Sequence, residues 1–220
     1  PNTYMELLTK LRNQIKEYHV SYRTTIIQTD TSLVDNLFID KRIHDYISSN
    51  MKKGKQYDFM IHHKPVSVYF YGNKHEYPVH VVATILHFLI PFSRNKCTSH
   101  LKIHIFYAPH LKHMPRIGEI VGPVHLNSGY TYRCSPGSEI VLFRKEEWCK
   151  VLIHECFHYL GLDEDLDKPK YNKEILKLFP IDTEVNIVES YCEVWARLLN
   201  CCVVSVLDKK PLKKLIQKER

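Results

Sequence analysis

Residues 145–161 read KEEWCKVLIHECFHYLG, and this stretch carries the clearest structural pattern in the sequence. Glutamates at positions 146 and 147 would lie in the first turn of a helix, where negative charge is favourable. Gly161 follows the last apolar residue and suits the left-handed position that closes many helices. The pattern therefore predicts a helix over residues 145–160.

The same stretch contains the pattern H-E-x-x-H at residues 154–158. Side chains four residues apart on a helix lie one above the other, so His154 and His158 can face one metal ion. Glu155 would stand beside that ion, where it can act as a general base on water. The alternative is a helix with two partly buried histidines and a surface glutamate. The helical context favours a catalytic Zn²⁺ site.

Outward from this helix, strand-like and helix-like segments alternate. Runs of β-branched and aromatic residues predict strands over 66–71, 101–107, 124–133 and 139–143. Helical patterns cover 3–18, 37–52, 78–90 and a final stretch from Asp182 to about residue 206, with a charged connection over 163–181. This order predicts an α+β fold in which a small mixed sheet packs beside long helices.

The length of 220 residues fits one domain with an appendage. We expect an N-terminal helical extension over residues 1–60, a catalytic domain over 61–207 and a basic C-terminal tail over 208–220. The tail holds six Lys or Arg and two Asp or Glu, so it contributes +4 of the net charge of +7. The positive charge therefore describes the tail more than the domain.

The helix with the motif, together with the final helix, resembles the zincin metallopeptidases. Zincins are similar in their order of elements: a mixed sheet with an edge strand beside the cleft, the H-E-x-x-H helix, then a helix that brings the third ligand. This resemblance spans about residues 65–205. The segments 125–132 and 144–163 also resemble uncharacterised zincin-like proteins of large DNA viruses, a likeness that implies no particular substrate.

The resemblance leaves two candidates for the third metal ligand. The metzincin pattern H-E-x-x-H-x-x-G-x-x-H would place Glu164 where its third histidine stands, but metzincins need a downstream methionine. All four methionines lie upstream of the motif. The stretch 189–193 resembles the gluzincin pattern N-E-x-x-x-D, which implies Glu189 as ligand and Glu193 as the carboxylate that orients His154. The gluzincin alternative is favoured.

Further residues are candidates for contacts with an oxyanion or a substrate. In zincins a Tyr or His beside the cleft often stabilises the oxyanion, and Tyr191, His125 and Tyr130 are candidates here. Asn127 begins the stretch 127–129, which would form either a cleft-edge strand that pairs with a peptide or a hairpin turn. For each of these residues ordinary packing is the competing interpretation.

The seven cysteines contain no C-x-x-C pair, and their number is odd. This usage indicates free thiols in a reducing compartment, hence a cytoplasmic location, or the host cytoplasm or virion for a viral chain. The longest apolar run, residues 79–92, is too short to cross a bilayer and contains two histidines, so no membrane span is expected.

These observations favour a zinc-dependent metallopeptidase with a peptide or protein substrate. The alternative is an inactive zincin-fold binding or virion structural protein whose basic tail contacts nucleic acid or an acidic partner. Nucleic acid is the weaker expectation, because the tail lacks interleaved aromatic residues. A deformylase-like hydrolase ranks lower still, since no glycine-rich substrate loop is present. The sequence leaves the oligomeric state open.

Overall fold

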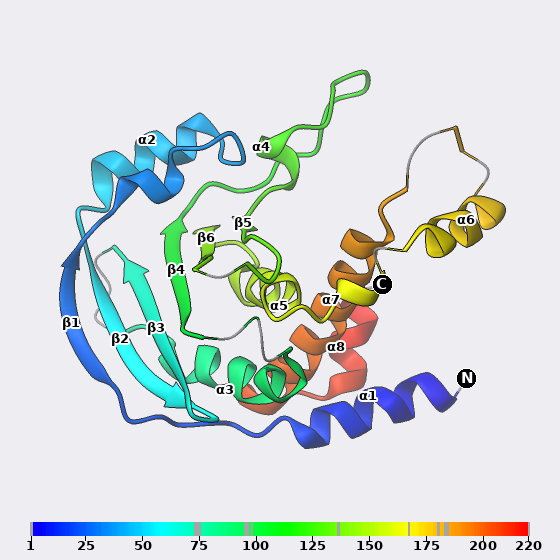
Figure 1. Ribbon diagram of the computed structural model, residues 1–220, viewed down its shortest axis with the longest axis horizontal. Helices are drawn as coiled ribbons and strands as arrows, with labels where there is room; N and C mark the ends of the chain where they lie inside the picture. The colour runs from blue at the N-terminus through cyan, green and yellow to red at the C-terminus, as the bar shows by residue number, and fades with distance from the viewer. Residues whose placement is uncertain are drawn as a thin grey trace.

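A six-stranded mixed sheet forms the centre of the computed structural model, in the order β1-β2-β3-β4-β6-β5 (Figure 1). The structure describes residues 2–72, 76–94, 97, 99–135, 137–166, 168–179, 181–182 and 185–219. The strands are β1 Arg23–Gln28, β2 Lys53–Ile61, β3 Lys64–Tyr71, β4 Leu101–Ala108, β5 Gly129–Tyr130 and β6 Ile140–Arg144. β3, β4 and β6 run parallel, and the other neighbouring pairs are antiparallel.

Helices cover both faces of this sheet. On one face lie α3 Val79–Leu89, α5 Trp148–Tyr159 and α7 Ile187–Leu207, which share a large core with β3, β4 and β6. On the other face, α2 Lys41–Asn50 and the 3₁₀ turn Thr31–Val34 cover a smaller core. Strands buried on both faces read as near-continuous apolar runs, as IVLF does at residues 140–143. The mixed sheet and the two long helices of the sequence prediction are thereby confirmed.

The N-terminal third differs from the prediction of a helical extension over residues 1–60. Helices α1 Asn2–Gln14 and α2 are present, but β1 and β2 lie between and after them and extend the sheet. The expected boundary between residues 60 and 61 falls inside β2. Strand β2 was not predicted because its sequence, KGKQYDFMI, contains Lys, Gly, Gln and Asp, which are uncommon in strands. Its apolar neighbours come from pairing with β3, which the sequence alone does not reveal.

The strand predicted over residues 124–133 is also wrong. Its first part is the short helix α4 Pro123–Leu126, and only Gly129 and Tyr130 form a strand, at the sheet edge. α7 begins later than predicted, because Asn186 rather than Asp182 caps it: the Asn186 side chain accepts from the Val188 N–H at 3.0 Å. The charged connection contains α6 Pro169–Leu178. α5 begins at Trp148, after a left-handed Glu147.

The sequence predicted that all seven cysteines are free, but two of them are not. Cys97 and Cys134 form a disulfide, whereas Cys149, Cys156, Cys192, Cys201 and Cys202 are free thiols. This pair could not be predicted from the sequence, because 37 positions separate its members and only the tertiary fold brings the two loops together. The expectation of a reducing compartment rested on free thiols, and Cys97 and Cys134 do not support it.

By length and composition α7 is apolar enough to cross a membrane. In the structure, however, it packs against α5, α1 and α8, and one side of it belongs to the core of the protein, whereas Val194 is 55% exposed.

The predicted basic tail is folded onto the domain rather than extended. Within it, α8 Leu212–Glu219 lies against α7, and its Ile216 is 5% exposed in a cluster with Leu8 and Cys201 (Figure 1). Its lysines point outward from an amphipathic helix. This segment is therefore not a free extended arm that could bind nucleic acid.

Replacing Ile216 with Ala should destabilise the protein by about 2–5 kcal/mol, because it leaves a cavity between α8, α1 and α7. Urea unfolding monitored by circular dichroism measures this change. The exposed Lys213→Ala on the same helix serves as the matched control and should unfold close to the wild type. Equal midpoints for I216A and wild type would show that α8 is a loosely attached tail.

Candidate metal centre

The motif on α5 places its two histidines one turn apart with their rings facing a common point. The Nε2 atoms of His154 and His158 lie 3.2 Å apart. Both side chains are largely buried, at 16% and 12% exposure. Apolar neighbours such as Leu152 and Ile153 anchor the opposite side of the helix in the sheet core. The helix is thus held rigidly with its histidine face directed outward from the core.

α7 packs against α5 and brings Glu189 to the same point. Its carboxylate oxygens lie 3.3 Å from Nε2 of His154 and 3.4 Å from Nε2 of His158. Tetrahedral coordination with bonds of about 2.0–2.1 Å spaces neighbouring donor atoms about 3.3 Å apart. The three measured separations match that spacing. Two imidazoles and one carboxylate are also a donor set that zinc accepts.

The remaining ring nitrogens face two further carboxylates. Nδ1 of His158 lies 2.6 Å from Oδ2 of the fully buried Asp163, and Nδ1 of His154 lies 3.5 Å from Oε2 of Glu193. Lys150 and Arg197 each donate to the other oxygen of Glu193 at 2.9 Å. A carboxylate at Nδ1 keeps the proton on that nitrogen and turns the Nε2 lone pair inward.

The carboxylates of the cluster stabilise positive charge on its two histidines, as the pKa values of these groups show. Burial alone would lower the pKa of His154, but the carboxylates of Glu189 and Glu193 raise it to about 9. Burial likewise opposes charge on His158, yet Asp163, Cys192 and Glu189 raise its pKa to about 12. Hydrogen bonds from both imidazoles hold the pKa of Glu189 far below its usual value. Protons supply the positive charge that a divalent cation would supply.

Glu155 has a different environment from the other carboxylates. It is 7% exposed, and burial raises its pKa to about 7, although the two histidines act in the opposite direction. It lines the same hollow as His154 and His158. A carboxyl with a pKa near neutrality can both accept and return a proton at physiological pH.

A cleft runs past this cluster. One hollow of about 450 Å³ is lined by both histidines, Glu155 and Glu189, and by residues of the sheet edge from Gly129 to Thr131. A smaller hollow of about 150 Å³ adjoins it and shares His154, Glu155, Glu189 and Gly129. At Gly129 a Cβ would lie 2.7 Å from Leu142 and 2.9 Å from Val151, so only glycine lets edge strand β5 approach α5 this closely.

The structure brings some of the predicted wall residues to the cleft. Tyr130 lines the larger hollow and donates its hydroxyl to the Leu33 carbonyl at 2.7 Å. Asn127 lines the smaller hollow and donates to the Phe38 carbonyl at 2.9 Å. Both polar groups are therefore committed to the wall, and they tie β5 and α4 to the segment before α2.

Three other predicted residues, Tyr191, Glu164 and His125, line neither of these two hollows. Tyr191 packs edge-on against Phe157 and Trp195. Glu164, the alternative third ligand, pairs with Arg94 at 2.9 Å and is absent from the cluster of donors. The structure thus brings Glu189, and not Glu164, to the two histidines.

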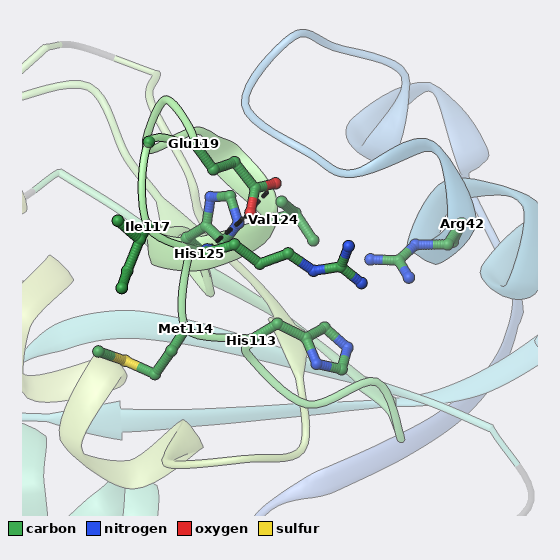
Figure 2. Close-up of a pocket in the computed structure, with 9 residues that line it drawn as sticks. Arg42, His113, Met114, Ile117, Glu119, Val124 and His125 are labelled. Carbon is green, nitrogen blue, oxygen red and sulfur yellow. Dashed lines mark hydrogen bonds and ion pairs between the residues drawn. The ribbon is translucent and has the colours of Figure 1, made fainter.

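His125 lines a different cavity, of about 730 Å³, beside α2 and the loop before α4 (Figure 2). Its Nδ1 accepts from the Gly122 N–H at 3.0 Å, and its Nε2 lies 3.5 Å from Glu119. The predicted role of His125 at the metal site is therefore wrong. The physical reason is the helical turn α4, which replaces the predicted strand and directs the imidazole away from α5.

Asp163 and the role of Arg133 were not predicted from the sequence. Asp163 follows the motif by five residues, after the glycine that ends α5, and the turn there folds its carboxylate back onto His158. Arg133 donates to the same carboxylate at 3.0 Å. The available signal was an acid two residues past the helix-ending glycine, but further acids at positions 164, 165 and 167 obscured it.

Comparisons with known proteins add a limited finding. No protein-family model matches the chain, and no solved structure matches it. A stretch of 75 residues is 40% identical to "Uncharacterized protein R210" of Acanthamoeba polyphaga mimivirus. That stretch covers 33% of this chain but 18% of the mimivirus protein, so the chain spans a small part of that relative. The match suggests a viral origin, and the zincin resemblance stays a prediction.

Asp163→Asn should destabilise the metal-free protein at pH 7 by about 2–3 kcal/mol, because a buried charge-assisted hydrogen bond to His158 is lost. His158 and Arg133 hold the pKa of Asp163 below its ordinary value despite burial, so its contribution is present above that value and disappears as pH falls. Denaturant unfolding at pH 7 and pH 3 should show the wild-type advantage shrinking on acidification.

The control for this change is Asp165→Asn, two residues along the chain, whose side chain is 73% exposed. It should leave the unfolding midpoint nearly unchanged at both pH values. A D163N protein as stable as D165N would contradict the assignment of Asp163 as the partner of His158.

Proposed function

We propose that the protein is a zinc-dependent metallopeptidase with a gluzincin-type ligand set. The observation that carries the proposal is the convergence of three lone-pair donors, Nε2 of His154, Nε2 of His158 and the Glu189 carboxylate, within 4.8 Å of one another. Lone pairs that converge in this way repel each other unless protons or a metal cation lie between them. The spacing of 3.2–3.4 Å supports a tetrahedral zinc ion in particular.

Zinc in such a site supplies Lewis-acid activation of a water molecule and of a substrate carbonyl. The chain's own residues have separate tasks. Glu193 and Asp163 keep the protons of His154 and His158 on Nδ1, which leaves both Nε2 atoms free to bind the ion. Glu155 accepts the proton of the attacking water and passes it to the leaving amine.

The shape of the cleft supports a peptide as substrate. Strand β5 is the last in the sheet order, and its residues line the hollow beside Glu155. An edge strand offers backbone groups that pair with an extended chain. A peptide bound alongside β5 would bring a carbonyl past the metal centre, with Tyr130 and Asn127 forming the wall through their own hydrogen bonds.

The first test is Glu155→Gln, which removes the proton acceptor while preserving shape. We expect zinc content close to that of the wild type and hydrolysis at least about 100-fold slower. Zinc is measured by elemental analysis, and hydrolysis with dye-labelled denatured casein and a mixed peptide library followed by mass spectrometry. Zinc-loaded wild type that cleaves neither probe would favour the inactive binding protein, and E155Q with full activity would exclude the mechanism.

The second test separates the two candidate ligands. Glu189→Gln removes a charged donor from the cluster and should weaken zinc binding about 10-fold or more, whereas Glu164→Gln should bind zinc as the wild type does. Competition with a chromophoric chelator gives both affinities. Retained zinc in E189Q together with its loss in E164Q would reverse the ligand assignment.

A further inference from the structure

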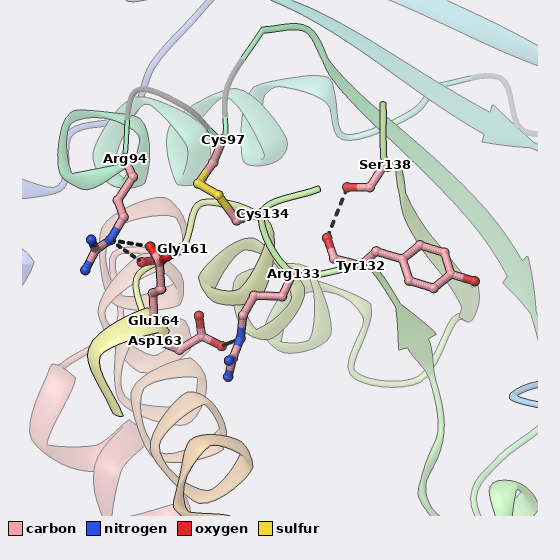
Figure 3. The surroundings of a disulfide bond; sticks show 9 residues. All are labelled: Arg94, Cys97, Tyr132, Arg133, Cys134, Ser138, Gly161, Asp163 and Glu164. Carbon is pink, nitrogen blue, oxygen red and sulfur yellow. Dashed lines mark hydrogen bonds and ion pairs between the residues drawn. A yellow bond between two sulfur atoms is a disulfide. The ribbon is translucent and has the colours of Figure 1, made fainter. Parts of the chain in front are cut away.

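The turn that follows α5 is enclosed by a disulfide. Gly161 has φ of +68° and ends the helix, and a Cβ there would lie 3.0 Å from Sγ of Cys97. Cys97 follows α3 in the chain and Cys134 follows β5, so their bond joins two loops directly over this turn (Figure 3). We call residues 94, 97 and 132–134, which this bond joins, the clasp.

The first arm of the clasp holds the turn through Arg94. Its guanidinium lies 2.9 Å from Glu164 (Figure 3). The same guanidinium lies 2.6 Å from Asp165, and the Arg94 backbone N–H donates to the Leu160 carbonyl at 3.1 Å. Cys97 donates its own N–H to the Arg94 carbonyl at 2.9 Å. The two acids that follow the turn, Glu164 and Asp165, are thus fixed to the loop that carries Cys97.

The second arm reaches the metal ligand itself. The Cys134 N–H donates to the His158 carbonyl at 3.2 Å. Nε of Arg133 donates to Oδ2 of Asp163 at 3.0 Å (Figure 3). The same oxygen of Asp163 lies 2.6 Å from Nδ1 of His158. One carboxylate oxygen therefore links the arginine of the clasp to the imidazole of the proposed metal centre.

We propose that Arg133 is a positioning residue for His158, acting through Asp163, and that the Cys97–Cys134 disulfide holds Arg133 in place. Reduction of the disulfide then weakens metal binding. This inference rests on the proposed metal site. Cys134 adopts a left-handed φ of +40°, which a non-glycine residue keeps only when its surroundings enforce it. Once the disulfide is reduced, we expect the backbone around Cys134 to move to a more favourable conformation.

The reduction can be carried out with a water-soluble phosphine. Phosphorus attacks one sulfur and the S–S bond breaks. Water then supplies the oxygen of the phosphine oxide, and two protons and two electrons end on the two thiols. Cys134 is partly exposed, so the reagent can approach from its side. A phosphine also avoids the zinc affinity of dithiol reductants.

The experiment compares zinc affinities of the full chain by competition with a chromophoric chelator. The oxidised protein should bind zinc about 10-fold more tightly than the phosphine-treated protein, the size of effect expected for residues that orient a ligand. Cys97→Ser/Cys134→Ser should match the reduced protein, and phosphine should not change it further. Far-UV circular dichroism confirms that each form remains folded.

Arg133 variants test the route through Asp163. Arg133→Gln should weaken zinc binding even in the oxidised protein, whereas Arg133→Lys should restore most of the affinity by keeping a cation beside Asp163. Arg23→Gln, on the far edge strand β1, is the matched control and should bind as the wild type does. Equal affinities for R133Q and R23Q would overturn the positioning role.

A readout without metal separates this inference from the proposed function. Histidine-selective ¹⁵N NMR of the metal-free chain reports the His158 Nδ1–H that is bound to Asp163. We expect this resonance to shift or disappear on reduction and in R133Q, and to persist in R133K. Such a change in a protein that binds no zinc would uphold the clasp and overturn the metallopeptidase. An unchanged resonance would overturn the clasp, whatever the zinc affinity.

Discussion

Nε2 of His154, Nε2 of His158 and the Glu189 carboxylate meet between α5 and α7, and the attraction of this carboxylate for positive charge at the two imidazoles is the constraint around which the rest of the site is organised. Both Nδ1 atoms face carboxylates, so both Nε2 atoms turn inward toward each other and toward Glu189. This arrangement needs a positive charge at its centre. With protons alone, the pKa of His154 rises to about 9 and that of His158 to about 12. A divalent ion would meet the same need without placing protons on two Nε2 atoms that lie 3.2 Å apart.

The fold supports this charged arrangement by burying the elements that surround it. α5 and α7 share the core above β3, β4 and β6, so neither helix can withdraw from the other without exposing apolar surface. The cleft wall is fixed by the buried Arg144, which donates to the backbone carbonyls of residues 110, 124 and 127. A guanidinium with three carbonyl acceptors holds the irregular segment around α4 that the sheet itself does not reach.

The parts of the site that could be predicted from the sequence are those that depend on one helix at a time. Spacing of four residues places His154 beside His158 on α5, and the same spacing on α7 links Glu189 to Glu193. What escaped prediction depends on chain segments that meet only after folding. Asp163 reaches His158 because a glycine turn reverses the chain. The disulfide joins loops from different parts of the sheet, and β2 is a strand chiefly because β3 lies beside it.

The two glutamates at the proposed zinc site illustrate how environment, and not residue type, divides the chemistry. Glu189 faces two imidazoles, which hold its pKa far below the ordinary value and keep it an anionic ligand. Glu155, one position from His154, is enclosed by the core, and burial raises its pKa to about 7. A ligand needs a permanent charge, whereas a proton carrier needs a pKa near that of the solution. The packing of α5 against the sheet and of α7 against α5 gives each carboxyl the environment that its proposed role requires.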